Sequence, residues 1–200
     1  EGRHRVSARD RILGRVREAL SERTAVEHPG SFEGWRPAAP ALPVDGLVHL
    51  LEAAGGEIVR QPNVDAAAAW LASFCADFGS SAVGETVPEP LRPPLPAGAP
   101  DTAPLGVSLA RGAVAETGSL IMDARDGRRA QLLVPTHVVF VRTRDVYVTM
   151  REALNVQADD LPSAIGFHSG PSKSADIGQI LVKGVHGPGR LVAVLMGDGD

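Results

Sequence analysis

The chain has 200 residues, of which 44% are hydrophobic and 22% charged, a balance typical of one soluble globular domain with a sizeable core. The formal net charge of −4 argues against a nucleic-acid binder that relies on diffuse positive charge. No apolar run approaches the ~20 residues that cross a bilayer. The first twenty residues are rich in Arg and have no apolar signal-peptide core, so we expect a cytoplasmic protein without membrane contact.

Cysteine and histidine usage limits the cofactors. Cys75 is the only cysteine, which excludes a disulfide within the chain and favours a reducing compartment. An iron–sulfur cluster needs several thiolates, so this chain cannot hold one alone. The six histidines show no HExxH or other metal-ligand spacing, and the fingerprints GxGxxG and GxxxxGK[ST] are absent. We therefore expect no metal site and no cofactor bound by this chain alone.

Residues 1–43 are expected to form a helical arm and a connector ahead of a single α/β domain over 44–200. Residues 7–22 have apolar side chains at helical spacing, with Ser7 as the N-cap and Asp10 three positions on. One interpretation is an arm that clasps a partner protein or a second copy of the chain. The other is a helix packed on its own domain with a solvated basic face. Residues 28–43 hold four prolines and two glycines, which indicates an extended connector.

Helices and short apolar strands alternate in the first part of the domain. Helices are expected over 45–54 and 65–78, with short strands over 57–60 and 81–83. This alternation predicts an α/β protein with a parallel or mixed sheet. Residues 84–104 hold seven of the sixteen prolines, which predicts a long surface loop or linker without a packed core.

The remainder of the chain is rich in expected strands. Apolar and β-branched runs predict strands over 105–109, 114–122, 132–134, 138–141, 165–168 and 191–195, with a turn at Asp126-Gly127. Helices are expected over 145–154 and 174–183.

The first candidate site is residues 115–119, which place an acid, two hydroxyls and a glycine inside an expected strand. A buried carboxylate is costly unless it is paired, so Glu116 should face a cleft or a charge partner. In the functional interpretation Glu116 is an acid/base or ligand-orienting group, Thr117 and Ser119 donate hydrogen bonds, and Gly118 permits close approach of a ligand. In the structural interpretation the segment is a β-bulge that ties the sheet together. The residues alone leave both open.

The second candidate site is residues 169–176, where an expected strand, a Gly-Pro-Ser turn and an expected helix start follow one another. That order points free N–H groups and the positive helix end at the space above the turn, the end of an α/β sheet where ligands collect. It predicts a small-anion site for a carboxylate or phosphate, built from Gly170, Ser172, Lys173, Ser174 and Asp176. Ordinary helix capping is the alternative, but it does not explain Lys173 at the positive helix end.

Two histidines complete the candidate catalytic groups. His186, beside Gly187, lies in a tight Gly/Pro loop where it could titrate or donate to a ligand, and His137 lies at the start of an expected strand. Each also has a structural interpretation as a lone histidine. This model of the active centre requires the Glu116 carboxylate and the Lys173 amine to share one pocket.

The segments AETGSL, LLVPTHVVFV, EAL, SGPSKSADIGQILVKGVHGP and LVAVLM, in that order, resemble the lactate-utilization (LUD) domain family, of the lactate utilization protein C type. The resemblance covers about residues 105–197. It implies a three-layer Rossmann-like sandwich similar to the NagB/RpiA/CoA transferase-like fold, and a role in oxidising L-lactate to pyruvate beside iron–sulfur oxidoreductase partners. The candidate residues match the family's motifs, whereas Gly178 stands where an acidic residue is common.

Beside a plain interaction module, two functions remain as hypotheses. In the first, the chain is the cluster-free component of an L-lactate utilization system. In the second, it is a stand-alone enzyme that binds a small phosphorylated, carboxylated or CoA-linked substrate in a cleft between Glu116 and Lys173. Fold resemblance to phosphosugar enzymes does not by itself transfer their reaction.

Overall fold

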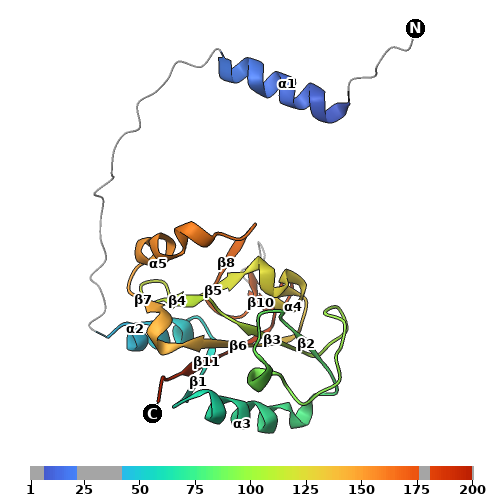
Figure 1. Cartoon of the computed structure of the whole chain (residues 1–200). Coiled ribbons are helices and arrows are strands. Elements are labelled where there is room, and N and C mark those ends of the chain that lie inside the picture. Colours follow the sequence, from blue (N-terminus) through green and yellow to red (C-terminus); the bar gives the residue numbers. More distant parts are fainter. Residues whose placement is uncertain (1–6, 22–41, 176–180, 200) are drawn as a thin grey trace. The chain divides into compact units, whose positions relative to one another are not determined.

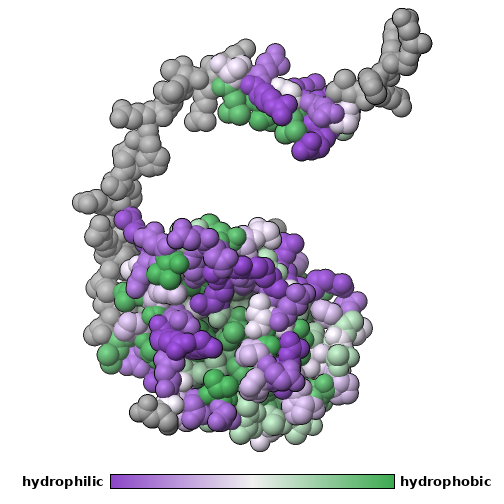
Figure 2. All heavy atoms as spheres, in the orientation of Figure 1, coloured by the Kyte–Doolittle hydropathy of each residue, from purple (hydrophilic) through white to green (hydrophobic). Residues whose placement is uncertain are grey.

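The structure is a computed structural model in which residues 7–21, 42–175 and 181–199 are described. The chain divides into two units, Glu1–Arg36 and Pro37–Asp200, which are described separately. In the first unit, helix α1 spans Ala8–Ser21, and the Ser7 hydroxyl accepts a hydrogen bond from the Asp10 N–H at 3.1 Å, as expected for the cap. Exposed apolar side chains follow one side of α1 (Figure 2), namely Ile12, Val16 and Leu20.

Five parallel strands form the central sheet of the second unit, in the order β1-β11-β6-β3-β2. They are β1 (Glu57–Gln61), β11 (Arg190–Met196), β6 (Thr136–Arg142), β3 (Leu105–Leu109) and β2 (Ser81–Val83). Alternate residues of each strand point to opposite faces of the sheet, and apolar side chains cover both faces. In β11, Val192 and Val194 pack into one core and Ala193 and Leu195 into the other. A parallel sheet of this kind must be covered on both faces.

Helices and a second sheet supply that cover (Figure 1). Helix α3 (Val64–Phe74) and the 3₁₀ turn Cys75–Asp77 pack on one face. Helix α2 (Pro43–Ala53) and part of a smaller sheet pack on the other. The smaller sheet has the order β7-β4-β5-β8 and consists of Val146–Tyr147, Gly112–Val114, Ser119–Asp123 and Ile165–His168. Helix α5 (Met150–Gln157) packs against that sheet. The expected α/β sandwich is confirmed.

The remaining elements are short. Helix α4 spans Arg128–Leu132, and strands β9 (Lys173–Ala175) and β10 (Leu181–Lys183) form an antiparallel pair. Turns of 3₁₀ helix occupy Glu89–Leu91, Ala124–Asp126, Thr143–Asp145 and Ala158–Asp160. Within the ranges that the structure describes, no helix combines the length and apolar character that a membrane span requires.

Several expected elements were wrong in type. Residues 114–122 are not one strand, because the chain reverses between β4 and β5. Residues 132–134 form the end of α4 and the segment after it rather than a strand, and Leu132 and Leu133 are exposed. Residues 145–154 contain β7 as well as the start of α5. The helix expected over 174–183 is instead the β9–β10 pair in its described part, since short apolar runs fit either type; residues 176–180 lie outside the described residues.

The proline-rich segment over 84–104 contributes to the core. Val87 and Leu91 are buried and pack with α3 against the central sheet, and Ala103 is buried in a smaller cluster. The expectation of a loop without a packed core was therefore wrong. Proline content restricts hydrogen bonding by the backbone but does not prevent neighbouring apolar side chains from being buried.

Candidate functional site

Residues 115–118 form the turn that joins β4 to β5, and this turn packs against α2. Gly118 has a φ of +61°, a left-handed conformation that favours glycine. A Cβ at Gly118 would lie 2.6 Å from the Cβ of Leu50 and 2.9 Å from the backbone N of Leu51. The glycine is thus explained by the close approach of the turn to a helix, which neither the bulge nor the ligand interpretation anticipated.

Glu116 caps helix α5. Its Oε1 accepts a hydrogen bond from the Met150 N–H at 2.6 Å, and its own N–H donates to the Val148 carbonyl at 3.1 Å. Thr149, the N-cap of α5, accepts from the Glu152 N–H at 3.1 Å. A carboxylate at a helix N-terminus is stabilised by the free N–H groups there. The Glu116 carboxylate was expected to face a cleft or a charged partner, and it binds the start of helix α5 instead.

Replacing Glu116 should test this capping role. Glu116→Ala removes the acceptor of the Met150 N–H and should lower the free energy of unfolding by about 1 kcal/mol. Glu116→Gln keeps an acceptor oxygen and should cost about half as much. Chemical denaturation of both variants checks this order. Equal losses for Ala and Gln would contradict the capping role.

A chain of hydroxyl groups joins the β4–β5 turn to the segment that follows β8. The Thr117 and Ser119 hydroxyls are 2.8 Å apart, and the Ser119 and Ser169 hydroxyls are 2.6 Å apart. Ser119 is buried, whereas Thr117 and Ser169 are exposed. The structure therefore brings the first candidate segment against the start of the second. Ser169 opens the second candidate segment, although it was not among the residues assigned to the anion site.

Backbone bonds tie Ser172 to the loop that holds His186. The Ser172 N–H donates to the Pro188 carbonyl at 2.7 Å, and the Gly184 N–H donates to the Ser172 carbonyl at 3.0 Å. The His186 N–H reaches the Ser172 hydroxyl at 3.3 Å. A Cβ at Gly187 would lie 3.3 Å from the Ser172 Cβ, so the two segments pack closely at this position. The second and third candidate segments thus form one unit, and the His186 side chain is exposed.

Lys173 binds the carboxyl end of α2. Its Nζ donates to the Ala54 carbonyl, and a Cβ at Gly170 would lie 3.0 Å from the same oxygen. A cation near a helix C-terminus is favourable. Lys173 itself belongs to strand β9, so the expectation that it lies at the positive end of a helix was wrong. Ser174 pairs with Val182 in the β9–β10 ladder, and Asp176 lies outside the described residues.

This unit lies at the amino ends of the central strands. Ala54 precedes β1, and Pro188 precedes β11. The expectation that the turn lies at the carboxyl end, where ligands collect, was wrong. It assumed that the strand over 165–168 belongs to the central sheet, whereas β8 runs antiparallel to β5 in the smaller sheet.

His137 is fully buried beneath the smaller sheet. Its Nε2 lies 3.0 Å from the Ser108 hydroxyl, and its Nδ1 has no hydrogen-bond partner among the described residues. The ring of His168 lies edge-on at 6.3 Å between centroids. Burial, followed by the charge of His168, lowers the pKa of His137 to about 3, and burial also lowers the pKa of His168. His137 is therefore neutral at physiological pH.

Asp126 is a second buried polar group that sequence reasoning assigned only to a turn. Its Oδ1 accepts hydrogen bonds from the N–H and hydroxyl of Thr86 at 3.0 and 2.7 Å, and its Oδ2 has no partner among the described residues. Burial raises the pKa of Asp126, although the hydrogen bonds from Thr86 act in the opposite direction. A Cβ at Gly84 would lie 2.1 Å from Oδ1. Glycine at that position makes room for the carboxylate.

The Glu116 carboxylate and the Lys173 amine do not meet directly in these contacts. Glu116 binds the start of α5, and Lys173 binds the end of α2. Their segments are joined instead through the Ser119–Ser169 hydroxyl pair. Among residues 7–21, 42–175 and 181–199, no three His, Cys, Asp or Glu side chains group in a way that could hold a metal ion.

Comparison with known proteins relates the same region to one family. Residues 101–196 match the model of the LUD domain. The lactate utilization protein C of Deinococcus radiodurans is 38% identical over 90 residues, which cover 42% of this chain and 42% of that protein. The proteins of the same name from Halalkalibacterium halodurans and Bacillus subtilis are 34% and 31% identical over 106 residues, covering 49% of this chain and 46% and 44% of theirs. The chain thus spans less than half the length of these relatives.

A solved structure shares the fold. It is the crystal structure of a DUF162 family protein from Deinococcus radiodurans, with a TM-score of 0.58 and 20% sequence identity over 80% of this chain and 99% of that one. The region that matches the family model contains Glu116, His137, Ser172, Lys173 and His186. Residues 101–196 are therefore similar to the LUD domain family, whose model they match.

Proposed function

We propose that this chain takes part in lactate utilization as a component that carries no iron–sulfur cluster and acts with iron–sulfur oxidoreductase partners. The observation that carries the proposal is the similarity of residues 101–196 to proteins named lactate utilization protein C. The single cysteine of the chain fits a component that leaves the electron-carrying clusters to other proteins. The exposed apolar side of α1 is the surface that we assign to contact with a partner or a second copy of the chain.

The proposed ligand is a small carboxylate or phosphate anion held by the unit around Ser172 and Lys173. The Lys173 ammonium has three donors, of which one is used by the Ala54 carbonyl. The hydroxyls of Ser169 and Ser172, and the adjacent glycines 170 and 187, would let an anion approach closely. Thr117, Gly118 and Ser119 would support this unit through the Ser119–Ser169 hydroxyl pair, and Ser174 would extend it along β9. Asp176, which lies outside the described residues, is assigned to the site from the sequence alone.

The three candidate catalytic side chains receive different proposed roles. His186 is exposed and adjacent to Ser172, so we assign proton exchange with a bound ligand to it. Glu116 and His137 would act as positioning residues. The first holds the start of α5, and the second supports β3 through Ser108.

Genetic deletion with affinity purification tests the role. A host that lacks the gene should lose growth on L-lactate as sole carbon source and regain it on complementation with the full chain. The tagged full chain should recover partners that contain iron and acid-labile sulfide, and the isolated chain should not oxidise lactate. Undiminished growth together with no such partner contradicts the proposal. Lactate-independent turnover of a phosphorylated or CoA-linked compound by the isolated chain would favour the stand-alone enzyme.

Lys173→Ala tests the anion site itself. Loss of the ammonium should weaken binding of lactate or phosphate by about 1–3 kcal/mol, because a charge-assisted hydrogen bond is removed. Lys183→Ala is the matched control, since Lys183 is exposed and faces Lys173 in the β9–β10 ladder. Isothermal titration of both variants measures the difference. If affinity is unchanged in Lys173→Ala, the lysine serves only the end of α2.

A further inference from the structure

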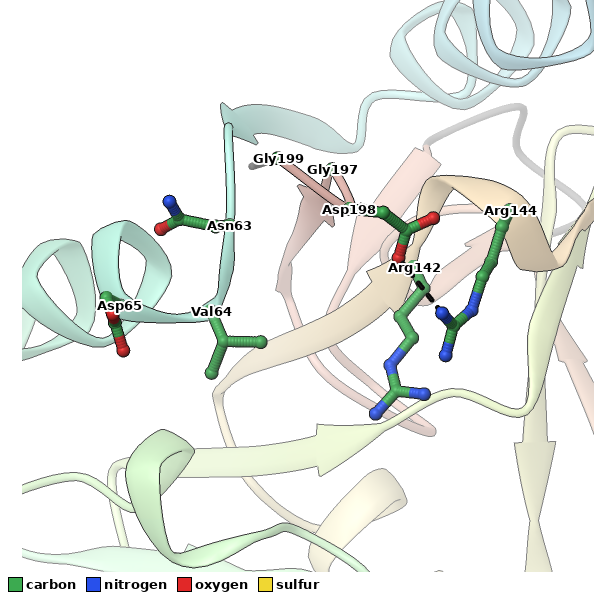
Figure 3. A pocket seen from close by; sticks show the side chains of 8 residues that line it. All are labelled: Asn63, Val64, Asp65, Arg142, Arg144, Gly197, Asp198 and Gly199. Carbon is green, nitrogen blue, oxygen red and sulfur yellow. Dashed lines mark ion pairs between the residues drawn. The ribbon is translucent and has the colours of Figure 1, made fainter.

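A cavity at the carboxyl ends of the central strands is lined by charged and polar residues that the proposed function does not use. Its volume is about 570 Å³, and it is lined by Asn63, Val64, Asp65, Arg142, Arg144, Gly197, Asp198 and Gly199 (Figure 3). Residues 63–65 follow β1, Arg142 ends β6, and residues 197–199 follow β11. These three strands are neighbours, so the segments meet at one edge of the sheet. In α/β folds, a crevice at this edge is where ligands bind.

The side chains of Arg142 and Arg144 both line the cavity (Figure 3). Arg144 is paired with Asp198 at 3.2 Å, and both side chains are about half exposed. Arg142 has no acidic partner within 4.0 Å among the described residues, and its side chain is half-buried. A guanidinium presents donors in a planar fork that matches phosphate and carboxylate oxygens. Arg142 therefore offers the cavity an unused anion-binding group.

The backbone that carries Asp198 is held in place on both sides. The Gly197 N–H donates to the Gln61 carbonyl at 2.9 Å, and the Gly199 N–H donates to the Pro62 carbonyl at 3.0 Å. A Cβ at either glycine would lie 2.6 Å from the Pro62 oxygen, so this close approach requires glycine. Asp198 is consequently fixed between two glycines and directed to Arg144. This wall of the cavity is built by specific contacts.

The opposite wall supplies hydrogen-bond acceptors. Asp65 lies in the first turn of α3, where its charge is favourable for the helix. The Asn63 side chain already accepts from the Ala66 N–H at 2.9 Å. A carboxylate such as that of Asp65 repels an anion but accepts hydrogen bonds from hydroxyl groups. The cavity therefore combines a cationic side with an acceptor side.

We propose that this cavity binds a phosphate monoester that also carries hydroxyl groups, of the size of a sugar phosphate. Arg142 and Arg144 would take the phosphate, and Asp65 would accept the hydroxyls. The volume lies within the range of about 300–1,000 Å³ that small-molecule sites occupy and leaves room for an organic group beside the phosphate. The site is independent of the anion site at Lys173, because it lies at the other end of the strands.

Titration of the full chain with glucose 6-phosphate tests the assignment. Glucose 6-phosphate should bind and glucose should not. Arg142→Gln should weaken binding roughly tenfold, the effect of losing one charge-assisted hydrogen-bonding group. Arg92→Gln removes the same charge at an exposed position paired with Glu89 and should leave affinity unchanged. Asp198→Asn should tighten binding several-fold, because it frees Arg144 and removes a negative charge from the cavity.

The opposite signs expected for Arg142→Gln and Asp198→Asn make the test selective. Equal affinities for the wild type and Arg142→Gln, with both variants shown by melting to be folded, would overturn the proposal. Equal weakening by Arg142→Gln and Arg92→Gln would also overturn it, since only net charge would then matter. Binding that is lost in Lys173→Ala but kept in Arg142→Gln would place the phosphate at the other end of the strands. The proposal would also be contradicted if neither glucose 6-phosphate nor inorganic phosphate bound at millimolar concentration.

Discussion

Between pH 7 and pH 5, the free energy of unfolding should fall by about 2 kcal/mol less in His137→Gln than in the wild type. Burial, together with the nearby charge of His168, lowers the pKa of His137 to about 3 in the folded chain. An unfolded histidine has a pKa of about 6.5. Between these values the unfolded chain binds a proton that the folded chain does not, so stability falls as the pH falls. His137→Gln cannot take up this proton, and its curve should be flatter.

The measurement is the free energy of unfolding from urea titrations at pH 7, 6 and 5. The absolute stability of His137→Gln will also reflect the lost contact with Ser108, so the slopes with pH are compared. Other groups act on the same curve. His168, whose pKa is also lowered, adds to the loss, and Asp126, whose pKa is raised, opposes it. Both are present in wild type and variant alike.

His49→Gln on the exposed side of α2 is the matched control for removing a histidine. The slope of His137→Gln should be flatter than that of His49→Gln. The carboxylates whose pKa values are lowered, Glu57, Asp123 and Asp160, lose their stabilising contribution mainly below this window. A His137→Gln slope identical to that of the wild type would show that His137 is not held neutral in the folded chain.

Asp123→Asn should lower the free energy of unfolding by about 3 kcal/mol, whereas Asp126→Asn should change it by about 1 kcal/mol or less. Asp123 is 4% exposed and accepts hydrogen bonds from Arg125 Nη2 at 2.7 Å and Arg111 Nη1 at 3.0 Å. Burial would raise its pKa, but the hydrogen bonds from Arg125 and Arg111 outweigh burial and lower it. Loss of its charge removes the buried carboxylate that Arg111 and Arg125 share and leaves them with the exposed Asp160.

Asp126 has the opposite environment three residues further on. Its Oδ1 is satisfied by Thr86, its Oδ2 has no partner in the described part of the chain, and its pKa is raised by burial. An asparagine keeps the Oδ1 acceptor and removes the cost of a buried negative charge. The new amide N–H could donate a hydrogen bond to the Ser108 hydroxyl, which lies near enough to affect the pKa of Asp126.

Urea denaturation at pH 7 measures the free energy of unfolding of both variants. Each variant makes the same change, from a carboxylate to an amide, at a buried aspartate. Asp160, which also binds Arg125 and Arg111, is exposed and should give a smaller loss as Asp160→Asn. A loss for Asp126→Asn as large as that for Asp123→Asn would contradict the difference between the paired environment of Asp123 and the unpaired Oδ2 of Asp126.

The two proposed anion sites lie at opposite ends of the same parallel sheet. Lys173 lies where the strands begin, next to the residues that precede β1 and β11. Arg142 and Asp198 lie where β6 and β11 end. Ligands at the two ends would therefore contact different loops while sharing β1 and β11. The variants Lys173→Ala and Arg142→Gln distinguish the two sites in any binding experiment.

Local patterns in the sequence identified the elements whose side chains repeat regularly. The strands over 105–109, 138–141 and 191–195 were expected and are present as β3, β6 and β11, because buried parallel strands are continuous apolar runs. The helices over 45–54 and 65–78 are present as α2 and α3, with shifted ends. The AETGS, GPSKS and GVHGP motifs also indicated correctly the family whose model matches residues 101–196.

Tertiary structure decided which groups these motifs contact. The turn at Gly118 depends on the position of α2, and the strand type of 173–175 depends on pairing with 181–183. The partners of Glu116, Met150 N–H and Val148 carbonyl, are more than thirty positions away along the chain. The burial of His137 and Asp126 depends on β8 and Thr86. Composition and periodicity report only on neighbours within a few residues, whereas pKa shifts, caps and cavities arise between segments that are distant in sequence and meet only in the folded chain.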